Sequence, residues 1–225
     1  ELAELKTFIL RDDFAQGPPP PPLPQWHYGY GYYNPESKHT ETFTELTIFK
    51  EGRWQPRDTY PNAELGYIAL NSGGGHPGGT PQHATIRRWI APSDGLINIT
   101  GTFNHPSEHG DGLTGYIVSS QKGLLGEFKV KQSNTKTDLN EIAVTAGDTI
   151  DFVASPQATP TNDSYDWSVE IFLNRTANAA DQSSKTTWKS QNDFTGPLPA
   201  SPVPLTPWAQ FAQVLLLTNE FMYVD

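Results

Sequence analysis

The chain has 225 residues, no cysteine and a single methionine. The absence of cysteine excludes disulfides, thiol nucleophiles, Cys-ligated zinc, iron–sulfur clusters and covalently attached c-type haem. Basic residues are also few, with 15 Lys and Arg against 25 Asp and Glu and a formal net charge of −10. Because they are scattered, the field repels phosphate backbones, and nucleic acid is not an expected partner.

Long hydrophobic runs are missing as well. The longest, VLLL with its flanks, is interrupted by Gln213 and Thr218. It falls short of the roughly 18 to 20 residues that a membrane span requires, so we expect no such span. The chain begins at Glu1 without an initiator methionine or a charged-then-apolar leader, which predicts a mature fragment or a piece of something larger.

The most regular feature is a period-two alternation of apolar residues. It follows a Pro-Ser-Asp-Gly turn in IRRWIAPSDGLINITGTF and a Gly-Asp turn in AGDTIDFVA. The same alternation recurs in WSVEIFL, residues 167–173. Such alternation indicates antiparallel strands with one buried and one solvated face. We assign the inward positions to Ile97, Ile99, Phe103, Ile150, Phe152, Ala154, Trp167, Val169, Ile171 and Leu173. This pattern predicts an all-β antiparallel β-sandwich.

Four segments follow from the changes in composition. Residues 1–25 form an N-terminal appendage that ends in a polyproline spacer, Pro18–Pro22, because consecutive prolines hold an extended polyproline II shape. Residues 26–174 form the sandwich, and residues 175–204 are a Pro-rich wrapping tail or linker. Residues 205–225 predict an α-helix packed on the sandwich, with Thr206 as N-cap, Pro207 as first helical residue and a strong apolar face.

Aromatic residues give the best functional clue. In WHYGYGYY the rings recur with period two, so four of them share one face. Exposed aromatic planes grip the apolar faces of sugar rings, while flanking polar groups contact the hydroxyls. The alternative is that the rings belong to the core or lie under the C-terminal helix. We assign candidate carbohydrate-binding residues, including one histidine of the glycine-rich loop, to Trp26, Tyr28, Tyr30, Trp54, His76 and Trp89.

Two histidine-containing loops can each be interpreted either as a structural turn or as a binding site. The glycine-rich loop from Gly73 to His83 suits a structural turn or a ligand cradle, and it is not a phosphate loop because no Gly-Lys-Ser/Thr follows. In NHPSEHGDG, His105 and His109 lack the spacing of a helical zinc motif, and the flanking Asn, Pro and Gly favour a hairpin turn. Calcium bound through Asp111 and backbone carbonyls is the other reading.

Catalytic motifs are weak. No two carboxylates are paired across an expected cleft, and no Ser nucleophile elbow occurs. We therefore expect a non-catalytic chain, although an enzyme acting on polysaccharide stays as an alternative.

Several longer sequence motifs resemble those of one protein family. GGHPGG, HPSEHGDG and AGDTIDF, together with the ending LTPWAQFAQVLLLTNEFMYVD, resemble the β domain and C-terminal helix of large exported cytochrome-type proteins of planctomycete bacteria. The resemblance implies a jelly-roll-like sandwich, similar to carbohydrate-binding modules, inside a multidomain protein whose haem-binding part lies elsewhere. This chain has no Cys-x-x-Cys-His, so it is expected to bind no haem.

Taken together, these features predict a carbohydrate-binding module that holds a larger exported protein on polysaccharide, in the periplasm, at the cell surface or outside the cell. The alternative is a structural or assembly module that contacts other domains of the parent protein. The resemblance also implies a structural Ca²⁺ ion held by turn carboxylates, for which the candidates are Asp111, Asp148 and Asp163.

Overall fold

The computed structural model describes residues 24–175 and 185–197. Over these ranges the chain is built from β-strands and one short 3-10 helix, η2 (Pro81–His83). No helix in the described ranges is long and apolar enough to cross a membrane. Most of the predicted N-terminal appendage and the whole predicted C-terminal helix, 205–225, lie outside the described residues.

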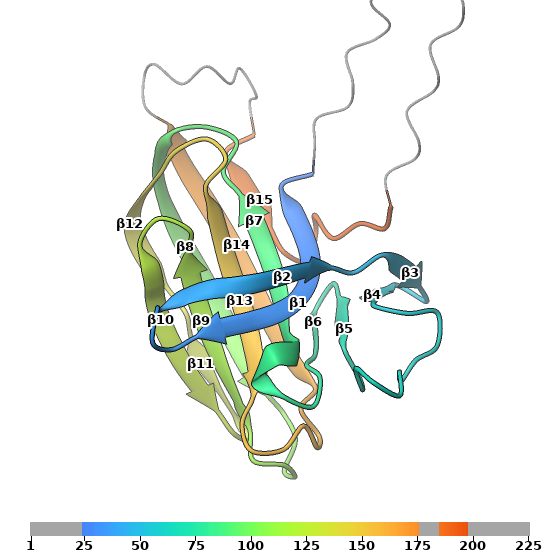
Figure 1. Ribbon diagram of the computed structural model, residues 1–225. Coiled ribbons are helices and arrows are strands. Elements are labelled where there is room, and N and C mark those ends of the chain that lie inside the picture. The colour runs from blue at the N-terminus through green and yellow to red at the C-terminus, as the bar shows by residue number, and fades with distance from the viewer. Residues whose placement is uncertain (1–23, 176–184, 198–225) are drawn as a thin grey trace, which may run out of the picture. The chain divides into compact units, whose positions relative to one another are not determined.

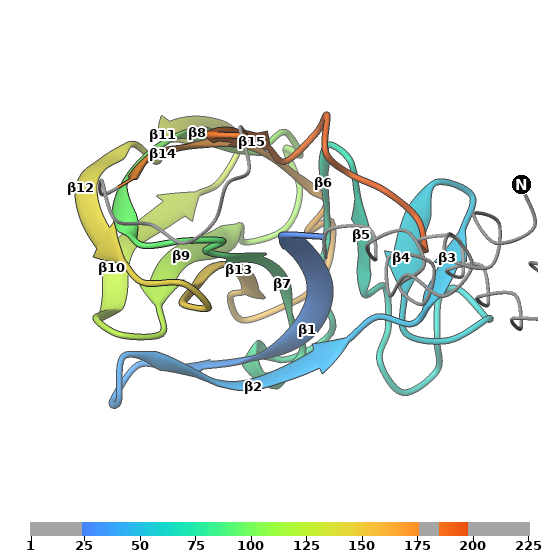
Figure 2. The same ribbon diagram turned by 90° about the horizontal axis from the view of Figure 1, so that it is seen from above.

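Two antiparallel sheets lie face to face, as Figures 1 and 2 show. The first sheet has six strands in the order β10-β9-β13-β7-β1-β2. Their bounds, in that order, are Gly123–Val130, Leu113–Ser119, Thr149–Pro156, Ala84–Ile90, Trp26–Asn34 and His39–Glu45. The predicted antiparallel β-sandwich is therefore confirmed.

The second sheet has nine strands, seven of them in the order β11-β8-β14-β6-β5-β4-β3. Their bounds are Ser133–Lys136, Gly95–His105, Tyr165–Arg175, Gly74–His76, Ala69–Asn71, Arg53–Gln55 and Ile48–Lys50. In addition, β12 (Leu139–Val144) pairs with β8, and β15 (Thr187–Lys189) pairs with β14. The longest pairing, β8 with β14, forms the centre of this sheet.

The core lies between the sheets and follows from the alternation. Along β8 and β14, every second residue is buried except Gly101 and Arg175, and the intervening ones are partly or fully exposed. A strand that packs on one side only requires this pattern. All ten positions predicted to face inward are buried: Ile97, Ile99, Phe103, Ile150, Phe152, Ala154, Trp167, Val169, Ile171 and Leu173.

The segment predicted as a tail or linker contributes to the sandwich. Residues Thr187–Lys189 form β15, whose central residue, Trp188, is 2% exposed and packs edge-on against Trp89. This part of the predicted wrapping tail or linker therefore adds a strand to the second sheet. A three-residue strand is too short to show an alternation, so burial of one large ring decides its place.

Two local expectations are also corrected. The loop between β8 and β9 is not a hairpin turn, because these strands belong to different sheets and the loop crosses between them. The apolar segment LGYIAL (residues 65–70) predicts one buried strand, but only its last two residues belong to β5 (Ala69–Asn71), and Tyr67 is exposed.

Candidate functional site

Three of the predicted sugar-contacting rings lie in the core. Trp26, Tyr28 and Trp89 have 4%, 5% and 0% of their surface exposed, and Trp26 stands directly opposite Trp89 between β1 and β7. Burial raises the pKa of the Tyr28 hydroxyl to about 12, although the nearby Arg87 charge opposes this. These rings offer no face to a ligand, so for them the alternative that the rings belong to the core holds.

The other face of β1 explains this burial. Gly29 lies there under the ring of Phe43, and a Cβ at Gly29 would come within 2.4 Å of that ring. Arg88 in turn places its guanidinium 4.0 Å from the same ring centroid and bonds Asp151 at 2.7 and 2.8 Å. Because the glycine face is covered by a neighbouring strand, the aromatic face turns to the core.

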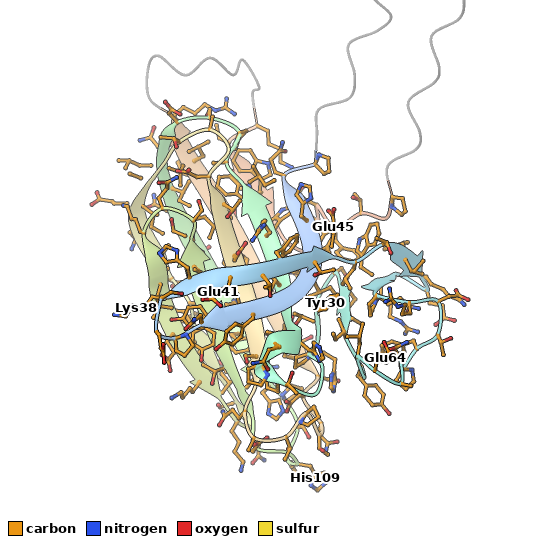
Figure 3. The ribbon with its side chains drawn as sticks, viewed as in Figure 1. Tyr30, Lys38, Glu41, Glu45, Glu64 and His109 are labelled. Atoms are coloured by element: carbon orange, nitrogen blue, oxygen red, sulfur yellow. The ribbon has the colours of Figure 1, made fainter. Side chains whose placement is uncertain are left out.

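The remaining predicted rings are partly buried. Tyr30 packs edge-on against His83, and Trp54 stacks near Tyr28 and donates its Nε1–H to the Thr195 carbonyl at 2.8 Å. Figure 3 shows Tyr30 on β1 beside the small 3-10 turn. Both rings therefore support packing between segments.

His76 occupies a different place, on β6 at the edge of an aromatic group. Its ring lies 5.3 Å from that of Tyr67, which is 51% exposed and meets Tyr60 at 5.9 Å. Arg53 covers the Tyr60 ring at 4.1 Å. Burial lowers the pKa of His76, and the hydrogen bond from Nδ1–H to the Pro77 carbonyl opposes this only in part. His76 is therefore neutral at pH 7. We name the aromatic group of Tyr60, Tyr67 and His76 the Tyr67 surface; the Tyr67 ring is exposed on it.

A larger hollow lies on the outer face of the second sheet. Its volume is about 570 Å³, within the range of small-molecule sites. The central strands β8 and β14 form the floor, the turn between β11 and β12 forms one wall, and β15 with the residues after it forms the other. We name it the outer groove; its lining residues are Thr100, Gly101, Thr102, Lys136, Asp138, Ser168, Val169, Glu170, Lys189, Gln191 and Asn192.

The walls of the outer groove are fixed to its floor. Asp138 accepts a hydrogen bond from the Gly101 amide at 2.9 Å, and Lys136 donates to the Thr102 hydroxyl at 3.1 Å. On the opposite side, Lys189 pairs with Glu170 at 3.2 Å. The groove thus offers hydroxyl, amide and carboxylate groups and two ammonium groups, with two formal charges of each sign.

An exposed ring continues the same face. Phe172 follows Glu170 by two residues on β14, so both side chains point outward about 7 Å apart along the strand. Phe172 is 46% exposed, and Leu96, its diagonal neighbour on β8, is 43% exposed. This ring was missed in the sequence, where it is recognisable as an aromatic residue at an outward position of the alternation Trp167, Val169, Ile171 and Leu173.

The three candidate calcium ligands do not meet at one site. Asp148 precedes β13 and accepts hydrogen bonds from the Thr145 amide at 2.8 Å and from Gln121 at 2.9 Å. Asp111 and Asp163 lie past the opposite end of that strand, in loops that touch. Within the described ranges, no three His, Asp or Glu side chains are grouped to hold a metal.

The sequence matches no family model and no curated protein. Solved structures that resemble part of the fold include a Podospora anserina GH26-CBM35 β-(1,4)-mannanase at 12% identity and a TM-score of 0.30, covering 68% of this chain and 29% of the mannanase. The C-terminal CBM6 of LamC, a marine laminarinase of Zobellia galactanivorans, has 15% identity, a TM-score of 0.23, and coverages of 39% and 72%.

A β-glucosidase of Kluyveromyces marxianus is similar at 10% identity and a TM-score of 0.29, with 67% of this chain and 16% of that chain covered. These superpositions are partial, and the chain spans less than a third of the mannanase and of the glucosidase.

Proposed function

We propose that the chain is a non-catalytic carbohydrate-binding module that binds a neutral polysaccharide along the outer groove, with Phe172 as the ring that stacks on a sugar. One observation carries the proposal: a hydrogen-bonding groove of about 570 Å³ lies next to the exposed ring of Phe172, on the same outward face of β14.

Both halves of that surface suit a sugar ring. A hexose presents hydroxyls around its edge and C–H groups on its faces, so it needs polar donors and acceptors beside an apolar plane. Glu170 and Lys189 supply the polar edge two residues from Phe172 on the same face. Sheets are stiffer than loops, so the floor of the groove keeps its shape before a ligand arrives.

Charge favours a neutral ligand. The two lysines and two carboxylates of the outer groove balance, and the whole chain carries a formal net charge of −10. A polyanionic glycan would be repelled at long range and would gain no net local attraction.

The wider setting of the module is part of the same proposal. It would hold a larger exported protein of the cytochrome type on its polysaccharide. The jelly-roll connectivity implied by the resemblance and the packed C-terminal helix remain predictions.

Affinity electrophoresis of the chain in gels that contain single polysaccharides tests this function. We expect retardation by at least one neutral glycan and none by an acidic one. Phe172→Ala should weaken the binding about tenfold, equivalent to about 1.4 kcal/mol of stacking. If no glycan retards the wild-type chain, the proposed function is wrong.

Tyr67→Ala is the matched control, because it removes another exposed ring and leaves the outer groove intact. Unchanged retardation of this variant places binding at the groove. Loss of retardation in Tyr67→Ala alone would instead assign sugar binding to the Tyr67 surface.

A structural or assembly role is the second candidate. It is favoured by Leu96, which places an exposed apolar side chain beside Phe172 where a protein partner could pack. Light scattering after gel filtration separates the two roles. A wild-type chain that self-associates but binds no glycan would support assembly, provided that Leu96→Ser abolishes the self-association.

A further inference from the structure

Two loops meet at one end of the sandwich, where Figure 3 shows His109 at the tip. The first, residues 106–112, joins β8 to β9, and the second, residues 157–164, joins β13 to β14. Gly110 has a φ of 87° and lies so close to the second loop that a Cβ would stand 2.3 Å from the Thr161 carbonyl oxygen. Only glycine satisfies both conditions.

A buried histidine holds the second loop from below. His105 is fully buried; its Nδ1 accepts the Gln132 amide at 3.3 Å, so its Nε2–H donates to the Asn162 carbonyl at 2.9 Å. This fixes the backbone of the residue just before Asp163. Both ring nitrogens are occupied, so His105 supplies no nitrogen ligand.

Asp163 is fully buried, and neither of its carboxylate oxygens has a hydrogen-bond partner among the described residues. A buried carboxylate without a partner costs several kcal/mol if it is ionised. The other two buried carboxylates of the described residues do have partners. Asp151 forms an ion pair with Arg88, and Asp148 accepts hydrogen bonds from Thr145 and Gln121. Asp163 therefore needs a partner that residues 24–175 and 185–197 do not supply.

Asp111 adds a second negative charge to this end. It accepts the Ala158 amide at 2.7 Å and both the amide and the hydroxyl of Thr159 at 3.1 Å. These three hydrogen bonds favour the charged form of its carboxyl group. Its loop meets the loop of Asp163 where Gly110 packs against Thr161, so both carboxylates lie at this end of the sandwich. A cation bound there would offset the repulsion between two negative charges.

We propose that the loops 106–112 and 157–164 bind one Ca²⁺ ion, with Asp163 as its buried ligand, Asp111 as the second carboxylate, and backbone carbonyls and water completing the shell. Calcium fits because the available donors are oxygens on irregular loops, whereas Mg²⁺ demands a stricter octahedron and zinc prefers nitrogen or sulfur. Asp148, predicted as a third ligand, has no part in this site.

Calcium titration by calorimetry, after removal of metal with EDTA, tests the site on the full chain. We expect one Ca²⁺ per chain, and a Tm that rises by about 5–10 °C at a hundredfold excess of Ca²⁺ over its Kd. Mg²⁺ at the same concentration should give a much smaller shift. No heat of binding together with an unmoved Tm would overturn the proposal.

Variants then assign the ligands. Asp163→Asn and Asp111→Asn should each weaken Ca²⁺ binding at least tenfold. Asp148→Asn should lower the starting Tm but keep the calcium-induced rise. If Asp163→Asn does not fold, Asp111→Asn decides, and wild-type affinity in Asp111→Asn contradicts the assignment. Retained glycan binding in metal-free protein separates this site from the outer groove.

Discussion

Asp151, Asp148 and Asp163 are buried carboxylates, and each meets a different set of groups. Asp151 binds the Arg88 guanidinium through both oxygens, and Asp148 is held by neutral donors from Thr145 and Gln121. Neither arrangement leaves an oxygen unbonded, in contrast to Asp163. At the scale of single residues, these differences decide which acids stabilise the metal-free fold and which require a ligand.

Asp148 should contribute to stability in a pH-dependent way. Desolvation raises its pKa, but the hydrogen bonds from Thr145 and Gln121 outweigh it, so the pKa is lowered on folding. A lowered folded pKa adds stability above the unfolded value, about 3.9, and this stability is lost as the pH falls below it. Asp148→Asn should thus lower the free energy of unfolding at pH 7 by about 1–2 kcal/mol.

Urea unfolding of the wild-type chain and of Asp148→Asn between pH 7 and pH 3 measures this effect. The difference between the two proteins should shrink as the pH falls below about 3.9, because the unfolded chain then binds a proton more readily than folded Asp148 does. A difference that stays constant over the whole range would mean that the charge of Asp148 is irrelevant to folding.

The aromatic residues show the limit of prediction at this scale. Period two predicted that Trp26, Tyr28, Tyr30 and Tyr32 share a face of β1. The first three lie in or against one core cluster, but the period alone does not say whether that face meets water. The answer depended on Phe43, which covers Gly29 from a neighbouring strand. Phe172 was predictable by the same rule, because an aromatic residue at an outward position has nothing in its own strand to bury it.

Among the elements, the long strands were predictable and the short ones were not. β8 and β14 have 11 residues each, enough to repeat the alternation several times. β4, β5, β6 and β15 have three residues each, and their places depend on pairing with distant parts of the chain. The outer groove was not predictable, because its walls come from β15 and the turn at Asp138, which only folding brings together.

Strand β15 should be an integral part of the domain. The Trp188 ring packs 5.3 Å from Trp89, and its Nε1–H donates to the Gln25 side chain at 3.3 Å. Removing a buried tryptophan costs about 3–5 kcal/mol through lost burial and a residual cavity. Trp188→Ala should show this loss in urea unfolding.

Lys189→Ala is the control within the same strand. Its ion pair with Glu170 is about half exposed on both sides, so the change should cost less than about 1 kcal/mol. Equal, small effects of both substitutions would show that β15 docks only weakly.

For the whole molecule, residues 24–197 form one compact unit with its own core. The outer groove lies on a sheet face and the proposed calcium site at a loop end, so neither shares side chains with the other. A change at one should leave the other intact unless it unfolds the unit. Binding measurements can therefore be combined with stability measurements on a single shortened chain.

A fragment of residues 24–197 should fold cooperatively, since both sheets and the core cluster lie within it. We expect a single thermal transition with a Tm close to that of the full chain, the same retardation by polysaccharide and the same rise in Tm with Ca²⁺. A fragment of residues 24–174 is the matched control. It lacks β15 and Trp188, whose indole fills the core beside Trp89, and it should lose the cooperative transition. If the shorter fragment unfolds as cooperatively as the longer one, the domain ends with β14 and the residues after it only line the groove.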